Sequence, residues 1–193
     1  MSKLIKAVQH SNIKRVTKLI SPESINFKDN DGDTALIYAS MYGYIEIVRL
    51  LINHEADVNI KNNDGYTALI LASSYGHINV VKLLINNGAN INIQNIYGDT
   101  ALMWVSDYGY IEVVKLLIDN GININIQNNY GNTALIMASE NGNIDIVQLL
   151  LNKGADVNIK NKYGYTALLL TSKRGHIDIV RLLLKHGADV ESD

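Results

Sequence analysis

The chain has 193 residues, of which 47% are apolar and 19% are charged, a balance that excludes intrinsic disorder and suits one globular unit or a short repeat array. Its 17 Lys and Arg residues nearly match its 19 Asp and Glu residues, so the net charge of −2 gives no reason to expect binding to nucleic acid or to an anionic membrane. No cysteine is present, which excludes disulfides, thiolate metal ligands and cysteine nucleophiles and is in keeping with a reducing compartment.

The first 28 residues are predicted to form an incomplete version of a unit that recurs along the chain. They align with that unit from Leu4, and their later loop at residues 21–24 is one residue short. Lys6, Gln9 and Asn12 interrupt the apolar residues, so no signal-type apolar core forms, and no later run approaches the roughly 18 apolar residues of a membrane span. We therefore expect a soluble, cytoplasmic protein that begins with a capping segment.

The rest of the chain repeats with a period of 33 residues. The tripeptide Thr-Ala-Leu begins at Thr34, Thr67, Thr100, Thr133 and Thr166. Two sets of glycines follow the same period, one before this tripeptide and one after it. The full repeats are predicted at 29–61, 62–94, 95–127, 128–160 and 161–193, and residues 1–28 form the partial repeat. We expect residues 1–193 to form a single domain.

Each repeat is predicted to contain a turn and two helices. In the second full repeat, residues 61–66 (KNNDGY) are turn-forming, and the hydroxyl of Thr67 is placed to cap a first helix from residue 68 to about residue 75. A second helix from residue 78 to about residue 87 is apolar on more than one side, so it must be covered on both sides. One repeat cannot bury this surface alone, and the sequence therefore predicts an all-α solenoid of stacked repeats.

This pattern resembles the ankyrin repeat, most closely in residues 65–92, GYTALILASSYGHINVVKLLINNGANIN. The resemblance implies stacked helix-turn-helix units with short β-turn fingers. It also implies a non-catalytic scaffold for protein–protein interaction that binds a partner protein or an extended peptide along its concave groove. The chain departs from the family in replacing Thr-Pro-Leu-His by Thr-Ala-Leu and a further apolar residue in every full repeat. Its low-Pro, Ile- and Asn-rich style is similar to that of ankyrin proteins from large DNA viruses.

Glu55 breaks the period where the other full repeats have a glycine after the second helix. A residue with a Cβ atom costs about 1 kcal/mol or more in the left-handed conformation that this position requires. We therefore expect the repeat at 29–61 to be the least stable internal one, and we expect Glu55→Gly to raise the unfolding midpoint.

The sequence offers no convincing catalytic, metal-binding or cofactor-binding residue. The acidic segment at residues 29–33 (DNDGD) begins like a calcium loop, but Thr34 and Ser40 stand where an EF-hand needs Gly and a bidentate Glu. The five His residues lack the i, i+4 spacing of a zinc helix, and the single glycines form no phosphate loop. Serines recur at the same place in every full repeat, which favours packing over catalysis. We expect no enzyme activity and no cofactor.

Residues that break the period are candidates for partner binding, because those that keep it preserve packing. They lie in the turn, on both sides of its glycine, and in the two positions before the second glycine of each repeat. By resemblance to ankyrin arrays, these two groups line one groove. Tyrosine is frequent among them and supplies a large contact area at a low entropic cost. The predicted partner-binding residues are Asp33, Tyr42, Tyr66, Tyr75, Tyr97, Asp99, Asp107, Tyr108, Tyr130, Tyr163, Tyr165, Lys173 and Arg174.

Two features of this surface allow further expectations. Its charge changes from acidic in the early repeats to basic in the last repeat, so a bound peptide should place its basic end near the N-terminal repeats. The tyrosines have an alternative explanation, because A/T-rich coding, which also favours Ile, Asn and Lys, raises the tyrosine content of any protein.

Three alternatives stay open at this stage. The chain can be an adaptor subunit that presents a substrate to a partner enzyme such as a ubiquitin ligase. It can also associate weakly with itself through the C-terminal repeat, whose second helix keeps the repeat pattern at residues 177–184 without a polar cap. Finally, four asparagines match a family residue that can be hydroxylated, although bracing of the turn is the ordinary role: Asn59, Asn92, Asn125 and Asn158.

Overall fold

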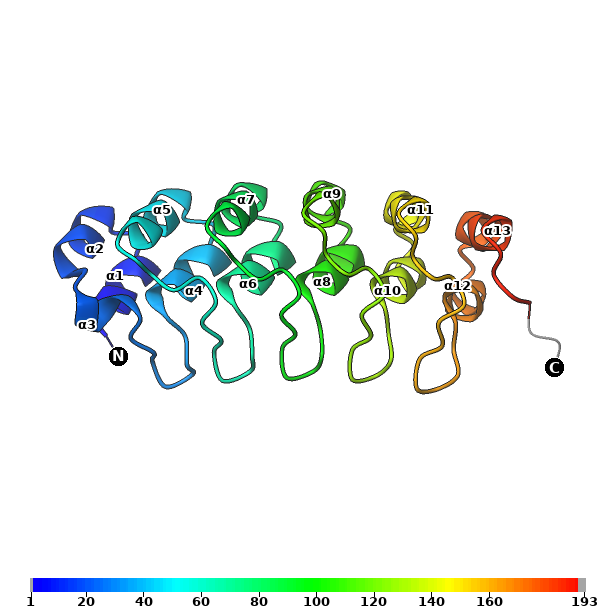
Figure 1. Cartoon of the computed structure of the whole chain (residues 1–193), viewed down its shortest axis with the longest axis horizontal. Coiled ribbons are helices and arrows are strands. Elements are labelled where there is room, and N and C mark those ends of the chain that lie inside the picture. The colour runs from blue at the N-terminus through cyan, green and yellow to red at the C-terminus, as the bar shows by residue number, and fades with distance from the viewer. Residues whose placement is uncertain (1, 191–193) are drawn as a thin grey trace. The chain divides into compact units, whose positions relative to one another are not determined.

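The computed structural model describes residues 2–190, and this part of the chain contains helices and turns but no strand (Figure 1). One compact unit runs to Ile96, and a second begins at Tyr97. The first unit contains α1 (Lys3–Gln9), α2 (Ile13–Leu19), α3 (Pro22–Ile25), α4 (Ala35–Met41), α5 (Ile45–Asn53), α6 (Ala68–Ser74) and α7 (Ile78–Asn86). The second contains α8 (Ala101–Tyr108), α9 (Ile111–Asp119), α10 (Ala134–Glu140), α11 (Ile144–Asn152), α12 (Ala167–Arg174) and α13 (Ile177–Lys185). The all-α prediction is confirmed.

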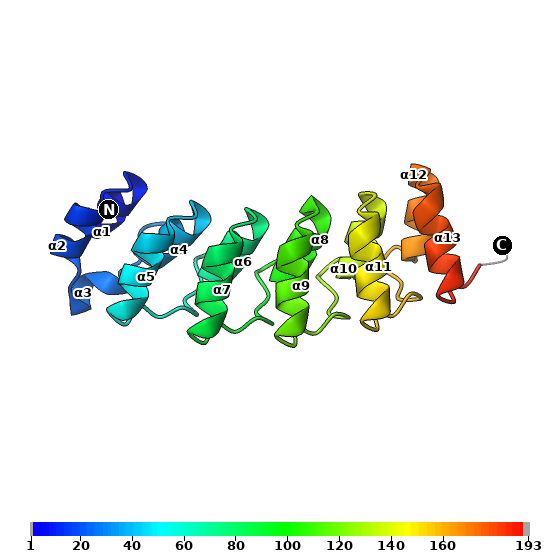
Figure 2. The same cartoon turned by 90° about the horizontal axis from the view of Figure 1, so that it is seen from above.

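Each unit has two layers of helices, and a finger-like turn precedes the first helix of every full repeat (Figures 1 and 2). In the first unit α1, α4 and α6 pack in one row, and α2, α5 and α7 pack in the other. In the second unit α8, α10 and α12 form one row, and α9, α11 and α13 form the other. The predicted stacking of repeats is therefore present within each unit. The last predicted repeat extends to residue 193, and its residues 191–193 lie outside the described part.

The threonines begin the first helices as predicted. In the second full repeat, the Thr67 hydroxyl accepts a hydrogen bond from the backbone N–H of Ile70 at 3.3 Å. The same cap occurs in the other four full repeats, at Thr34, Thr100, Thr133 and Thr166. Residue 55 is left-handed, as the sequence predicted, with φ of +66° for Glu55. Helices α6 and α7 end one residue earlier than expected.

Two features of the partial repeat were not predicted. Residues 22–25 form the short helix α3, where the sequence analysis placed only a loop. Pro22 suits the first position of a helix because its missing N–H needs no partner there, and the N–H of Ser21 donates to Oγ of Ser24 at 2.9 Å. Ser11 is left-handed with φ of +50°, at the point where the full repeats have their second glycine.

Neighbouring fingers within a unit are joined by backbone hydrogen bonds. In the first unit the N–H of Asn63 donates to the carbonyl oxygen of Asp31 at 3.0 Å. In the second unit the N–H of Lys162 donates to the carbonyl oxygen of Tyr130 at 2.9 Å. These bonds hold the turn tips at a constant spacing, which places the non-repeating side chains on them side by side.

The layers enclose a core of aliphatic side chains. In α7, Val80, Val81 and Leu84 are buried, as the apolar pattern of that helix predicted. Full burial stabilises each such side chain by about 1.5–3 kcal/mol. Four of the five recurring serines, Ser40, Ser73, Ser106 and Ser139, are fully buried, as expected of small packing residues, whereas Ser172 of the last repeat is exposed.

Thr171→Val is expected to raise the free energy of unfolding by about 1 kcal/mol. Thr171 is fully buried in α12, and within the described residues its hydroxyl finds no hydrogen-bond partner. A buried unpaired hydroxyl is destabilising, whereas valine has the same shape without that group. Val105 already occupies the equivalent position of α8 and is also fully buried. Urea unfolding at pH 7 provides the measurement, and a lower stability of the variant contradicts this interpretation.

Candidate partner-binding surface

The predicted partner-binding residues lie in two places in each repeat, and we call the surface that they form within each unit the finger face of that unit. It consists of the turn residues that flank the first glycine of a repeat and the two residues that precede its second glycine. Turn residues are positioned by the stacked fingers, and the second group is positioned by the C-terminal end of the first helix. Six tyrosines of this face are between 44% and 66% exposed, namely Tyr42, Tyr75, Tyr97, Tyr108, Tyr130 and Tyr163. Tyr66 and Tyr165 are half-buried.

In the first full repeat, an aromatic row connects the turn with the end of α4. The rings of Tyr38 and Tyr42 stack with their centres 6.4 Å apart, and those of Tyr42 and Tyr44 stack at 5.5 Å. The hydroxyl of Tyr38 donates to Oδ2 of Asp29 in the turn at 3.0 Å. Burial of Tyr38 raises its pKa to about 12, and Asp29 adds to this effect. Tyr38 therefore links Tyr42, at the end of α4, to the turn residue Asp29.

The same row occurs in the third full repeat, with tryptophan in the innermost place. Trp104 and Tyr108 of α8 stack with ring centres 5.8 Å apart, and Tyr110 follows at 6.2 Å from Tyr108. Tyr44 and Tyr110 were not predicted to belong to the surface. They occupy the position after the second glycine, where the other full repeats have His or Asn, so comparison between repeats could have identified them.

In the last repeat the turn and the first-helix end also adjoin. Nζ of Lys173, near the end of α12, lies 4.0 Å from the centre of the Tyr165 ring in the turn. The ring of Tyr163 lies beside Tyr165, with ring centres 6.4 Å apart. A cation over an aromatic ring is a favourable contact. In this repeat the turn residue Tyr165 and the first-helix residue Lys173 are therefore in direct contact.

Four of the predicted charged residues contact neighbouring repeats. Asp99 is only 9% exposed and accepts a hydrogen bond from Asn128 at 2.8 Å, so it offers little surface to a partner. Asp33 and Asp107 are half-buried and accept hydrogen bonds from Asn62 at 2.9 Å and from Asn141 at 2.6 Å, respectively. Arg174 forms an ion pair with Glu140 at 2.7 Å. These side chains connect repeats as well as lining the finger face.

Burial also changes the acidity of two of these carboxyl groups. The pKa of Asp33 is raised mainly by burial and then by the nearby charges of Asp29, Asp31 and Asp64, against a lowering by the hydrogen bond from Asn62. The pKa of Asp107 is likewise raised, again mainly by burial. Ionisation of Asp33 or Asp107 therefore destabilises the folded state.

Asp33→Asn is expected to raise the free energy of unfolding at pH 7, and the gain should shrink towards pH 3. Because the pKa of Asp33 is raised in the folded state, its contribution to stability is highest at low pH and is lost as the pH rises through the folded pKa. Asparagine resembles the neutral acid at every pH, and Asn132 already accepts the equivalent bond from Asn161 at 2.9 Å. Urea unfolding at the two pH values tests this, and an equal gain at both contradicts it.

The recurring asparagines and two of the histidines connect successive repeats. Oδ1 of Asn59 accepts from the N–H of Asn90 at 2.8 Å, and its Nδ2 donates to the carbonyl oxygen of Gly88 at 3.1 Å. Asn125 and Asn158, which lie two and three repeats after Asn59, make the same pair of bonds within the second unit. These contacts show the bracing role. His77 and His176 donate to backbone carbonyl oxygens of the preceding repeat, at 3.0 and 3.1 Å.

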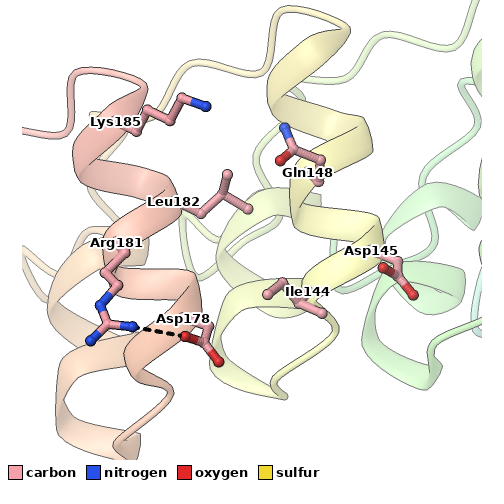
Figure 3. A pocket seen from close by; sticks show the side chains of 7 residues that line it. All are labelled: Ile144, Asp145, Gln148, Asp178, Arg181, Leu182 and Lys185. Atoms are coloured by element: carbon pink, nitrogen blue, oxygen red, sulfur yellow. Dashed lines mark hydrogen bonds and ion pairs between the residues drawn. The ribbon is translucent and has the colours of Figure 1, made fainter.

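The second helices carry a separate feature. A shallow groove of about 370 Å³ lies between α11 and α13, where Leu182 points towards α11 and Ile144 lies opposite (Figure 3). Asp178 and Arg181 form an ion pair at 3.3 Å on its edge. None of the predicted partner-binding residues lines this groove.

The described residues offer neither a metal-ligand cluster nor a membrane-spanning helix. No group of three or more His, Cys, Asp or Glu side chains in residues 2–190 is arranged to hold a metal ion. No helix in the same residues is long and apolar enough to cross a membrane.

Comparison with known families gives a consistent result over most of the chain. The model described as ankyrin repeats in three copies matches residues 4–95 and 91–161. The model described as ankyrin repeats in many copies matches residues 140–184. A comparison with curated proteins finds no match. Because the matched segments cover far more than half of the sequence, the chain belongs to the ankyrin-repeat family.

Proposed function

We propose that this protein is a non-catalytic scaffold that binds a partner protein, or an extended peptide of one, through its finger face. Ankyrin repeats are in general protein–protein interaction modules and are typically non-catalytic. The observation that carries the proposal is the aromatic row, because Tyr42 and Tyr108 are about half exposed and each stacks on a neighbouring ring of its own repeat. Exposed tyrosines held by stacking give a rigid contact area at low entropic cost.

The first unit favours a basic partner segment. Its turns carry Asp29, Asp31, Asp33 and Asp64, and none of these forms an ion pair with Lys or Arg within the described residues. Their mutual repulsion helps to raise the pKa of Asp33. A lysine or arginine of a partner would relieve this repulsion, and the exposed ring of Tyr42 could accept the same cation on its face.

A selection of random peptides on the wild-type chain tests this proposal. We expect the selected peptides to carry Lys or Arg, and we expect the double variant Tyr42→Ala, Tyr75→Ala to bind them at least about tenfold more weakly. A matched control is Asn79→Ala, Lys82→Ala on the exposed side of α7, which should leave the affinity unchanged. Selected peptides without basic residues, or equal losses in both double variants, contradict the proposal.

An adaptor that presents a substrate to a partner enzyme, such as a ubiquitin ligase, is the second candidate. It is favoured by a difference between the units: the turn carboxylates of the first unit lack ion pairs, whereas in the second unit Glu140 is paired with Arg174 and Lys173 lies over Tyr165. Two chemically different finger faces suit two different partners. If the adaptor proposal holds, selection should give two classes of peptide, one lost on substitution of Tyr42 and the other on substitution of Tyr165.

The cysteine content bears on the compartment in which the protein acts. The absence of cysteine suits a reducing compartment, and we propose that the protein acts in the cytoplasm.

Weak self-association through the last repeat is a further proposal. It is supported by Leu184, which is 42% exposed, whereas its equivalent Leu151 is 8% exposed. Light scattering over a concentration series tests this, and a strict monomer eliminates it.

A further inference from the structure

The first unit contains a cleft of about 490 Å³ at the junction between the partial repeat and the end of α5, and we call it the N-terminal cleft. Ile20, Pro22 and Ile25 supply apolar surface from the segment that contains α3. Asn53 and Glu55 supply polar groups from the end of α5 and the residues after it. The cleft depends on the irregular partial repeat, because α3 replaces the loop that the full repeats have at this place.

Glu55 is costly to the fold. Its backbone is left-handed with φ of +66°, whereas the equivalent residues of the other full repeats are Gly88, Gly121, Gly154 and Gly187. A Cβ atom added at any of these glycines meets no heavy atom within 4 Å, so space does not explain the difference. The cost is the backbone conformation itself, about 1 kcal/mol or more.

No internal contact of the side chain offsets this cost. Within residues 2–190 the Glu55 carboxylate has neither a hydrogen bond nor an ion pair, and the Asn53 side chain also has no hydrogen bond. Residues held in sparsely populated backbone conformations cluster at functional sites. The carboxylate at the cleft is therefore available to a ligand.

His54 also lines the cleft, but its position has a structural explanation. Its Nδ1 donates to the carbonyl oxygen of Leu50 at 2.8 Å. Asn87 and Asn120 make the same bond to the residue four positions earlier in α7 and α9, so this contact closes the last turn of each of these three helices. We assign no ligand contact to His54.

We infer that the N-terminal cleft binds the side chain of a lysine or arginine in a partner protein. This inference rests on the proposed function and adds a second contact point for a basic partner, separate from the finger face. The aliphatic part of such a side chain can pack on Ile20 and Ile25, while its cation pairs with Glu55. No Lys or Arg of this chain lines the cleft, so nothing within it competes for the carboxylate.

The test is an NMR titration of the folded chain with three blocked amino acids: Nα-acetyl-lysine methylamide, Nα-acetyl-arginine methylamide and, as an uncharged control, Nα-acetyl-norleucine methylamide. We expect saturable shifts of the amide signals of Ile20, Ile25, Asn53 and Glu55 with at least one of the cationic probes. The norleucine probe should bind at least about tenfold more weakly. The absence of saturable shifts at these residues with both cationic probes overturns the inference.

Two variants separate charge from backbone strain. Glu55→Gln keeps the length of the side chain and should weaken binding of the cationic probe at least about tenfold with no change in unfolding midpoint. Glu55→Gly should weaken binding equally while raising the midpoint by about 2–4 °C, because the strain is relieved. Unchanged probe affinity in both variants overturns the inference.

The titration result for the N-terminal cleft can be distinguished from the result of the peptide selection that tests the proposed function. The blocked amino acids probe the cleft, whereas the peptide selection with Tyr42→Ala, Tyr75→Ala probes the finger face and leaves the cleft intact. Failure of the titration with success of the selection removes the cleft alone, and the reverse result removes the finger-face proposal alone.

Discussion

Gly131→Ala is expected to lower the free energy of unfolding by about 3 kcal/mol, whereas Gly164→Ala should lower it by about 1 kcal/mol. Both glycines have φ of +79°, so alanine meets the same backbone strain at each. A Cβ atom at Gly131 would lie 2.8 Å from the backbone nitrogen of Lys162 and 2.9 Å from Cα of Asn161 in the next finger. At Gly164 it would meet no heavy atom within 4 Å. The difference between the two variants therefore measures the close approach of neighbouring fingers.

Urea unfolding of both variants, followed by circular dichroism, provides the comparison. Repeat arrays can unfold in more than one step, so the slope of each transition should be compared with that of the wild type before free energies are subtracted. Equal losses in the two variants would mean that the fingers of the second unit do not approach each other in solution as they do in the structure.

Leu135→Ala is expected to lower the free energy of unfolding by about 3 kcal/mol, and Leu168→Ala by roughly half as much. The two leucines occupy equivalent positions of α10 and α12, so their helix propensities and immediate sequence contexts are matched. Leu135 is 1% exposed because α10 packs between α8 and α12, whereas Leu168 is half-buried. A leucine that already contacts solvent loses less apolar burial, and leaves a smaller cavity, when it is truncated.

The same unfolding experiment measures both leucine variants, and Thr171→Val serves as a control in which α12 is altered without loss of volume. A loss at Leu168 as large as that at Leu135 would contradict the claim that burial by the following repeat stabilises each first helix. Such a result would place most of the stabilisation within single repeats.

The sequence predicts the regular part of this structure well, because every local signal occurs five times. Threonine caps such as that of Thr67, and the left-handed Glu55, were predicted from the internal comparison of repeats and are confirmed. The helix α3 and the left-handed Ser11 lie in the partial repeat, which departs from the period and therefore offers no internal comparison. Short local contacts, such as that between Ser21 and Ser24, decide the structure there.

The sequence predicts only part of the candidate surface. The exposed tyrosines are residues that break the period, so comparison of repeats identified them. The partners of the charged residues could not be identified in this way: Asn128 lies 29 residues after Asp99, and Arg174 lies 34 residues after Glu140. Such pairs depend on how far each repeat is shifted relative to its neighbour, which only coordinates show.

Partner binding is expected to depend on side chains that do not contribute to the packing of the repeats. Its most direct test is the quantitative capture of cellular proteins by the wild-type chain and by a triple variant, Tyr75→Ala, Tyr108→Ala, Tyr130→Ala, with the fold of each checked by its unfolding midpoint. A second triple variant on the second helices α7, α9 and α11, Lys82→Ala, Lys115→Ala, Gln148→Ala, is the control. We predict that the tyrosine variant loses the captured proteins while the control keeps them, whereas equal recovery by the tyrosine variant and the wild type would contradict the account.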